Sequence, residues 1–287
     1  MRSFDRLNPI TVLIYYIFTV SIPMFSLDPV IAFISFFWSV FFDVLLHNRF
    51  GKKYVFLLIL FLISSLINPI FNTNGTTVLL FINDLPITLE AFVYGIFSSL
   101  TIIAVIVWFF TFSHIMTSEK ILYIFGRISA KIALVISMTL RFVPLFLKNY
   151  KKTEAALKCT GIYDTDKVSG VLKLKIRAFS ALLTQCTENG IITADSMEMR
   201  GYGKGRRTFF SVYKFTAGDI VLCILFIILG VSCLLLLGDI QFYPVLWESY
   251  AIISNIPAYT LYCILAALPT FITVAEGIRW KYLLSKI

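Results

Sequence analysis

The stretch that decides the fold is AFVYGIFSSLTIIAVIVWFFTF, residues 91–112, which contains no charged side chain. A helix that crosses a bilayer needs about 20 mostly apolar residues, with a range of roughly 17–25. In lipid, each backbone polar group must be satisfied within the structure, and long apolar runs without alternation do this as helices rather than as barrel strands. The stretch therefore predicts a transmembrane α-helix.

Five other segments are similarly long and apolar, at residues 10–27, 30–46, 54–70, 220–237 and 256–274. The composition agrees with them, because 59% of the 287 residues are hydrophobic and only 14% are charged. A soluble domain would carry roughly 25% charged residues. We predict an all-α, polytopic membrane protein with about six transmembrane helices.

The charged residues predict the orientation of the chain in the membrane. Cytoplasmic loops accumulate Lys and Arg. With six spans and a cytoplasmic N-terminus, all 25 Lys and Arg fall in the N-terminus, the second loop, the long insert and the C-terminal tail. The loops on the other side carry carboxylates alone, at Asp28, Asp84, Glu90, Asp239 and Glu248. We predict a multi-pass protein of the cell membrane with both termini in the cytoplasm. The net charge of +9 then reflects topology, and no nucleic-acid partner is expected.

These patterns divide the chain into three regions. Residues 1–113 form an N-terminal bundle of four spans, 114–215 a cytoplasmic region, and 216–287 a C-terminal pair of spans with a basic tail. The sequence of the cytoplasmic region predicts amphipathic helices at about residues 119–127, 130–158 and 171–200. Its segment 129–147 is almost long enough to span, but Lys131 and Arg141 would each cost about 2.5–3.5 kcal/mol at the bilayer centre. We expect that segment along or just under the inner leaflet, or packed beneath the bundle.

The third predicted helix has one continuous apolar face, because its small and apolar residues recur every three or four positions. The face consists of Leu172, Ile176, Phe179, Leu183, Cys186, Gly190, Ala194 and Met197.

The second and third predicted helices end alike, with a glycine directly after the last turn. We name Cys159-Thr160-Gly161, preceded by Lys158, the first tip, and Met199-Arg200-Gly201 the second tip. A glycine in this place commonly adopts a left-handed conformation that caps the helix. A cation near a helix C-terminus gains about 0.3–1 kcal/mol from the helix dipole. Arg200 is therefore either a capping residue alone or a binding residue.

Four stretches together resemble a known family. The most specific is ADSMEMRGYG, residues 194–203, which resembles a motif of the transmembrane T component of energy-coupling factor (ECF) transporters. LRFVPLFLKNYKKTEAALKCTG at 140–161 is similar to the first coupling segment of that family. NPIFNTNGTTVLLFINDLPITLEAFVYG at 68–95 and RWKYLLSKI at 279–287 resemble its extracellular loop and the C-terminal ending of some members.

The resemblance implies a non-catalytic scaffold for the uptake of a vitamin or other micronutrient. It would link two cytoplasmic ABC-type ATPases to a small membrane subunit that captures the substrate. It would need no cofactor, since ATP binds to the partner subunits. The second and third helices of the insert would be long coupling helices, and the apolar face of the third would contact partners. Each tip would dock on one ATPase through an arginine.

The first tip departs from the pattern of the family, because Thr160 stands where an arginine is expected. Three explanations are open. Lys158 supplies the cation, or the first tip binds a more apolar groove, or the two ATPases differ and docking is asymmetric.

Two other classes of protein compete with this interpretation of the sequence. An intramembrane enzyme is disfavoured, because the chain has only two histidines and no Gly-x-Ser-x-Gly, His-Glu-x-x-His or phosphate-loop motif. A self-sufficient transporter, or an ordinary ABC permease, is the main alternative. Substrate paths usually contain ionisable residues deep in the spans, and Asp43 is the one noted here, close to the inner interface.

Overall fold

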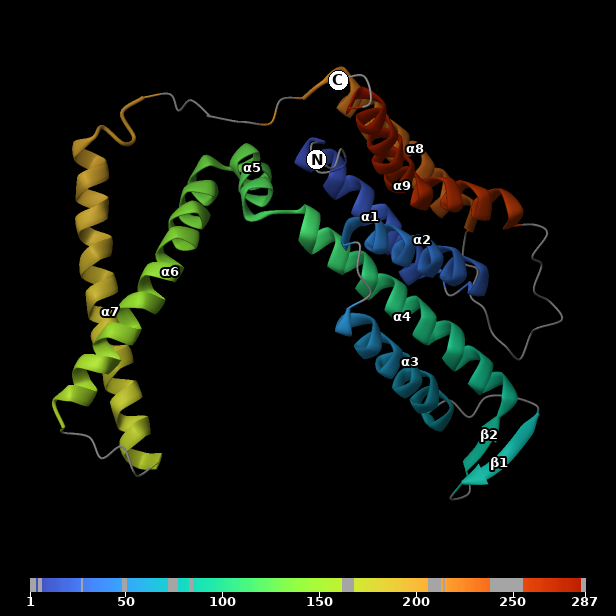
Figure 1. The fold of residues 1–287 in the computed structure, drawn as a ribbon, viewed down its shortest axis with the longest axis horizontal. Coiled ribbons are helices and arrows are strands. Elements are labelled where there is room, and N and C mark those ends of the chain that lie inside the picture. The colour runs from blue at the N-terminus through green and yellow to red at the C-terminus, as the bar shows by residue number, and fades with distance from the viewer. Residues whose placement is uncertain are drawn as a thin grey trace. The chain divides into compact units, whose positions relative to one another are not determined.

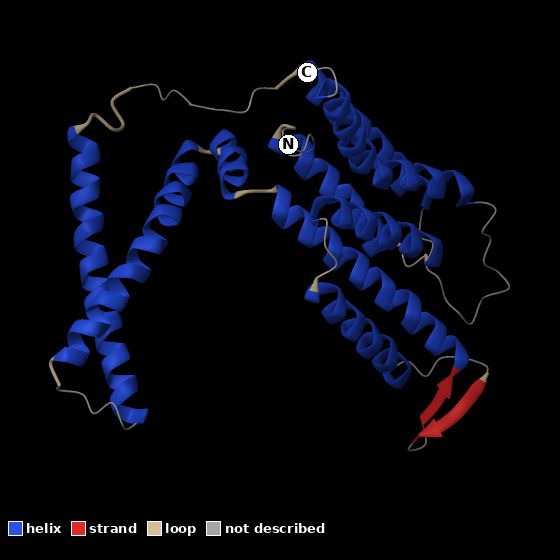
Figure 2. Cartoon of the chain, in the orientation of Figure 1, coloured by secondary structure: helices blue, strands red, loops and turns tan. Residues whose placement is uncertain are grey.

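The computed structural model describes residues 4, 7–26, 28–47, 51–71, 77–82, 85–161, 168–205, 213, 215–237 and 255–284. Most of these residues are helical, and one β-hairpin and short turns and loops account for the rest (Figures 1 and 2). The contacts group the chain into two compact units, one of residues 1–121 with 213–287 and one of residues 122–212. The elements are α1 (Pro9–Phe25), α2 (Pro29–His47), α3 (Lys52–Phe71), β1 (Val78–Ile82), β2 (Leu85–Thr88), α4 (Leu89–Ile115), α5 (Ser118–Ile128), α6 (Ala130–Cys159), α7 (Val168–Met199), α8 (Ala217–Leu237) and α9 (Ile256–Leu284).

Each predicted span is a helix in the first unit, namely α1, α2, α3, α4, α8 and α9. Local capping sets where two of them begin. The Asn8 side chain accepts a hydrogen bond from the Ile10 amide at 3.1 Å, with Pro9 in the first helical position. Thr88 accepts in the same way from the Ala91 amide at 3.3 Å, which starts α4.

Six of the described helices are long and apolar enough to cross a membrane, and this set differs from the prediction in one helix. It contains α2, α3, α4, α8 and α9, and also α6, whose apolar window has no buried residue. Helix α1 has 17 residues, which is at the short end of the spanning range. Eight of its residues are nevertheless buried in the first unit.

Aromatic rings fill the centre of the first unit. Tyr15 and Trp108 lie 6.0 Å apart between ring centroids, and both are fully buried. Phe4, Phe42 and Phe226 pack around them. Burying an indole N–H or a phenol O–H without a partner is costly. The Trp108 Nε1–H accordingly donates to Ser35 Oγ at 3.1 Å, and the buried tyrosine hydroxyls donate across helices as well.

Two glycines let helices of the bundle approach closely. A Cβ on Gly95 of α4 would lie 2.9 Å from the backbone oxygen of Ser65 in α3. A Cβ on Gly230 of α8 would lie 2.4 Å from the ring of Phe18 in α1. Small residues at such crossings allow backbones to pack in lipid, where no hydrophobic effect drives helices together.

The β-hairpin is the feature that the all-α prediction did not include. Strands β1 and β2 pair antiparallel, with Val78 opposite Thr88 and Ile82 opposite Leu85. The Leu89 amide donates to the Thr77 carbonyl at 3.0 Å, so the hairpin runs directly into the start of α4. The hairpin occupies the loop between the third and fourth predicted spans.

The second unit consists of α6, α7 and most of α5. The three helices predicted in the insert are confirmed, with ends within three residues of the prediction. Helix α7 has 32 residues and is about 48 Å long at about 1.5 Å per residue. Helices α6 and α7 cross each other, with their C-terminal ends at opposite ends of the pair (Figure 1).

Candidate functional site

The first tip is a neutral, self-capped helix end. Helix α6 ends at Cys159, and Gly161 has the left-handed φ of +65° that its predicted capping position requires. The Gly161 amide donates to the Lys158 carbonyl at 3.2 Å. The Thr160 hydroxyl donates to the Leu157 carbonyl at 2.7 Å, so it supplies a hydrogen bond to one of the free carbonyls at the end of its own helix. Cys159, Thr160 and Gly161 are all exposed.

Lys158 is the only cation among the described residues 155–161. Its ammonium lies 2.9 Å from the Glu154 carboxylate, one helical turn earlier. Its side chain is 54% exposed, so solvent screens this pair and it contributes little to stability. Residues two apart on a helix do not share a face. The Lys158 charge therefore projects about 200° around the helix from position 160.

The second tip is held by a complete two-bond cap. The Tyr202 amide donates to the Met197 carbonyl at 3.0 Å, and the Gly201 amide donates to the Glu198 carbonyl at 2.9 Å. These are the two bonds of a Schellman motif, with Gly201 at φ +80°. Arg200 is thus the last half-helical residue, and capping fixes where its side chain leaves the backbone.

The side chains of the second tip face outward. Met199 is 90% exposed, and Arg200 is exposed as well. No described residue forms an ion pair with the Arg200 guanidinium. A shallow, open depression of about 450 Å³ lies beside it, lined by Ile192, Asp195, Ser196, Met199 and Arg200. This end of α7 therefore presents an apolar group and a planar cation together.

The predicted apolar face of α7 does not pack against α6. Leu172, Ile176, Phe179 and Leu183 are each more than half exposed. Gly190 and Ala194 are exposed too, while Cys186 and Met197 are partly buried. The described part of α7 thus carries an open apolar surface along most of its length.

A second row of residues makes the contact between α6 and α7, and the sequence analysis missed it. Leu174, Ala178 and Leu182 are buried in α7. They recur every four residues, as a packed stripe does. Their spacing was visible in the sequence. However, α7 has two such apolar stripes, and the local sequence does not indicate which of the two packs against α6.

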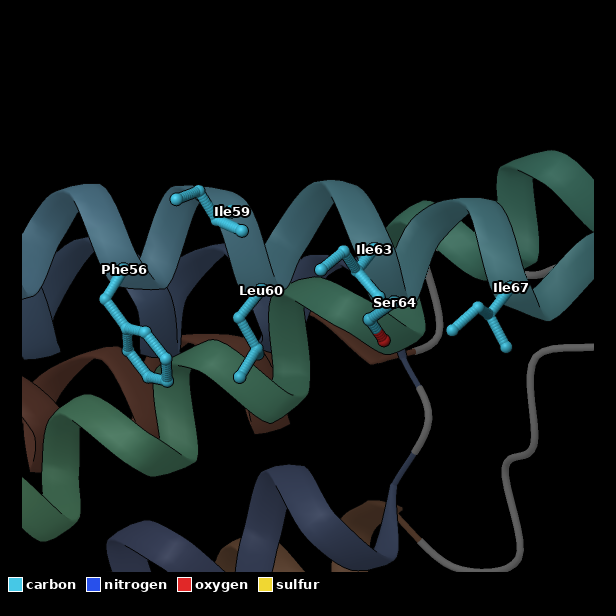
Figure 3. Close-up of a pocket in the computed structure, with 6 residues that line it drawn as sticks. All are labelled: Phe56, Ile59, Leu60, Ile63, Ser64 and Ile67. Carbon is cyan, nitrogen blue, oxygen red and sulfur yellow. The ribbon is translucent and has the colours of Figure 1, made fainter.

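One surface depression of the first unit lies on α3. It has a volume of about 380 Å³ and is lined by Phe56, Ile59, Leu60, Ile63, Ser64 and Ile67. Figure 3 shows these side chains projecting from successive turns of one helix. The Ser64 hydroxyl is the one side-chain polar group in its lining. A site for a polar solute needs several converging polar groups, so this apolar depression does not fit such a site.

Asp43 and Asp219 are two of the buried carboxylates that join helices in the first unit. Asp43 of α2 accepts hydrogen bonds from Lys53, at 2.6 Å, and from the Tyr54 hydroxyl at the start of α3. Asp219 of α8 accepts from Thr216, and it also accepts from the Asn8 amide before α1 at 3.4 Å. The sequence analysis missed Asp219, although Thr216-x-x-Asp219 has the spacing of a capping box. Both carboxylates have structural partners.

In the part of the chain that the structure describes, no group of three or more His, Cys, Asp or Glu side chains could hold a metal ion. None of the curated protein sequences compared with the chain matches it. The sequence model of one family does match, over residues 1–210, and its description is "cobalt transport protein" (CbiQ). The match covers α1 to α7 and therefore both tips. The chain belongs to the CbiQ cobalt transport protein family, the family of the T component of ECF transporters, and is a multi-pass membrane component of such a transporter.

Proposed function

We propose that the chain is the transmembrane scaffold of an ECF-type ABC importer. It couples ATP hydrolysis by two cytoplasmic ATPases to a small membrane subunit that captures a vitamin, a metal ion or another micronutrient. It is itself non-catalytic and holds no cofactor, because ATP binds to the partner subunits. The N- and C-termini, α6 and α7 lie on the cytoplasmic side.

The observation that carries the proposal is α7. A helix of about 48 Å with an open apolar surface is costly to leave in water, and such a surface marks a contact with another protein or with lipid. The same helix ends in an exposed cation, Arg200, beside a cap of two hydrogen bonds. A helix with an apolar surface along its length and a cation at its end can bind a hydrophobic membrane subunit and a polar ATPase groove at the same time.

The aromatic core supports the role of a scaffold rather than of a carrier. Its rings fill the centre of the first unit, and the polar atoms of Trp108 and the buried tyrosines bond to other helices. A substrate path through the bundle would instead require polar groups facing a cavity. Substrate selection is therefore assigned to a separate membrane subunit.

Arg200 is suited to docking on an ATPase. Its guanidinium offers five donors in a planar fork, and it cannot lose its proton at physiological pH. Carboxylates and carbonyls in a partner groove can bind such a fork bidentately. Removing one partner of a buried, hydrogen-bonded charge pair costs about 2–5 kcal/mol.

The transport step follows from the placement of the tips. When ATP closes the ATPase pair, the two docked helix ends are drawn toward each other. The crossing helices α6 and α7 convert this movement into a shift of the apolar surface, and the capture subunit seated on it reorients. Crosslinks that fix the separation of Cys159 and Arg200 are expected to abolish uptake and leave ATP binding intact.

Purification of a tagged copy from native membranes tests the proposal. The wild-type chain is expected to bring down ABC-type ATPases and a small hydrophobic subunit. Arg200→Glu is expected to lose the ATPases and keep the hydrophobic subunit. Arg177→Glu is the matched control, because it reverses an exposed cation on the same helix away from the tip. A wild-type chain that purifies alone and moves solute by itself would establish the alternative, a self-sufficient transporter.

A further inference from the structure

Helix α4 ends in a turn that a buried lysine of the next helix closes. Lys120 lies in the first turn of α5 and is only 4% exposed, although lysine is rarely buried without a partner. Its ammonium donates to the carbonyl of Ile115, the last residue of α4, at 2.9 Å. The same carbonyl accepts a second bond from the Thr117 amide at 3.1 Å. Ile115 and Met116 are buried too, so little water reaches this carbonyl.

The place of the ammonium is electrostatically favourable. The C-terminus of a helix carries about half a negative charge, and a cation is stabilised there most when the pair is partly buried. If the start of α5 moved away from α4, the ammonium and the carbonyl would lose their bond in a site with little water. Such a loss is costly, so Lys120 ties the two helices together more firmly than an exposed lysine could.

The ends of α6 and α7 are closed in another way. A left-handed glycine follows each helix, at Gly161 and Gly201, and backbone amides make the caps. A cap of this kind ends its own helix and does not tie that helix to the next element. The cap of α4 comes instead from a side chain of the following helix, and the turn at residues 116–117 contains no glycine. This cap therefore joins two helices as well as ending one.

The C-terminal end of α4 is also bonded to other helices of the first unit. Thr111, one turn before Ile115, accepts a hydrogen bond from the Tyr16 hydroxyl of α1 at 3.1 Å. Trp108, nearly one turn earlier, donates to Ser35 of α2 at 3.1 Å. All of these bonds lie within the first unit. This end of α4 is thus held by α1 and α2, and it is held by α5 through the lysine.

We propose that Lys120 is a positioning residue for transport, because it makes the joint between α4 and α5 rigid. This inference rests on the proposed function. The second unit begins at Leu122, two residues after Lys120, so movement of the coupling helices that travels along this part of the chain passes the joint. A loose joint would absorb the movement. A joint closed by a buried charge passes it to α4 and to the helices bonded to α4.

Hydrogen exchange in the purified complex first measures the strength of the joint. Lys120→Met removes the ammonium and keeps a side chain of similar length in the buried site. The population of the open turn should rise about ten- to a hundredfold, because a hydrogen bond to a charged group is lost. The Ile121 amide, which donates to the Thr117 carbonyl at 3.1 Å, reports this opening. Lys131→Met is the matched control, since Lys131 is an exposed lysine of α6.

Electron paramagnetic resonance then shows whether movement reaches the joint. Nitroxide amino acids replace Ser113 of α4 and Glu119 of α5, which are both exposed, and the distance between them is measured with and without a non-hydrolysable ATP analogue. With Lys120 present, the distance is expected to be the same in both states. In Lys120→Met the analogue is expected to change it, because the loosened joint absorbs the movement.

Two further variants separate this role from folding alone. Lys120→Arg keeps the charge and the donors, and it is expected to behave as the wild type does in both measurements. Lys120→Gln keeps a neutral donor and takes the place of the methionine variant if that variant does not fold. An intermediate rise in exchange is expected for it, together with a distance that depends on the analogue.

Three results would overturn the inference and leave the proposed function standing. The first is unchanged exchange in Lys120→Met, because the ammonium would then not hold the joint. The second is faster exchange with a distance that ignores the analogue, which would make Lys120 a structural cap only. The third is a distance that changes with the analogue in the wild type. A wild-type complex without ATPases would instead refute the proposed function, and the inference with it.

Discussion

Gly201→Ala tests whether the cap of α7 presets the position of Arg200. Gly201 has φ +80°, and an L-residue in the left-handed region costs about 1–2 kcal/mol. A Cβ there has no neighbour within 4 Å, so the cost comes from the backbone and not from a clash. Since the tip is exposed, opening the last turn relieves the strain without unfolding the protein. The population of the open tip should rise about 5- to 30-fold.

Amide hydrogen exchange in the detergent-purified protein measures this opening. The amides of Gly201 and Tyr202, which close the cap at 2.9 and 3.0 Å, are expected to lose protection by that factor. Gly190→Ala is the control, because Gly190 lies inside α7 with open space around its Cβ position and no positive φ. There alanine should stabilise the helix by about 0.8–1 kcal/mol. Unchanged exchange in Gly201→Ala would show that the two-bond cap does not hold the tip.

Three further substitutions test the packing of the first unit through thermal unfolding in detergent. Gly95→Ala places a Cβ against a backbone oxygen of α3 and should lower the free energy of unfolding by about 1–3 kcal/mol. Gly277→Ala is the control, because a Cβ there has nothing within 4 Å, and it should leave the unfolding temperature unchanged or raise it. Equal effects of the two substitutions would refute the close contact of α3 and α4. Asp219→Ala removes an acceptor shared by the starts of α1 and α8 and should cost about 1–3 kcal/mol; a neutral result would mean that water replaces it. Asp43→Asn weakens the bonds to the lysine and tyrosine that begin α3 and should cost about 1–3 kcal/mol. An unchanged unfolding temperature would contradict this role.

The sequence predicted the helices of the first unit well, because lipid leaves a long apolar segment few alternatives to a helix. It also predicted both glycine-capped tips, since a left-handed residue after the last turn is a local requirement that glycine meets. The sequence analysis did not count α6 among the spans, whereas the apolar part of α6 is long and apolar enough to cross a membrane and the shorter α1 is not.

The side chains that join distant segments could not be predicted from local pattern. Asp219 meets Asn8 across 211 positions of the chain, and Trp108 meets Ser35 across 73. Which apolar stripe of α7 packs on α6 depended on the partner helix, and the sequence analysis singled out the stripe that stays exposed.

What the sequence determined by itself is therefore the set of helices, their caps and the charge of each tip, because these depend on residues within one or two turns. The tertiary structure alone decided which apolar surface of α7 remains open and which aromatic rings from different helices pack together in the centre of the first unit. These features depend on where side chains point and on what lies beside them, and composition and spacing do not specify either.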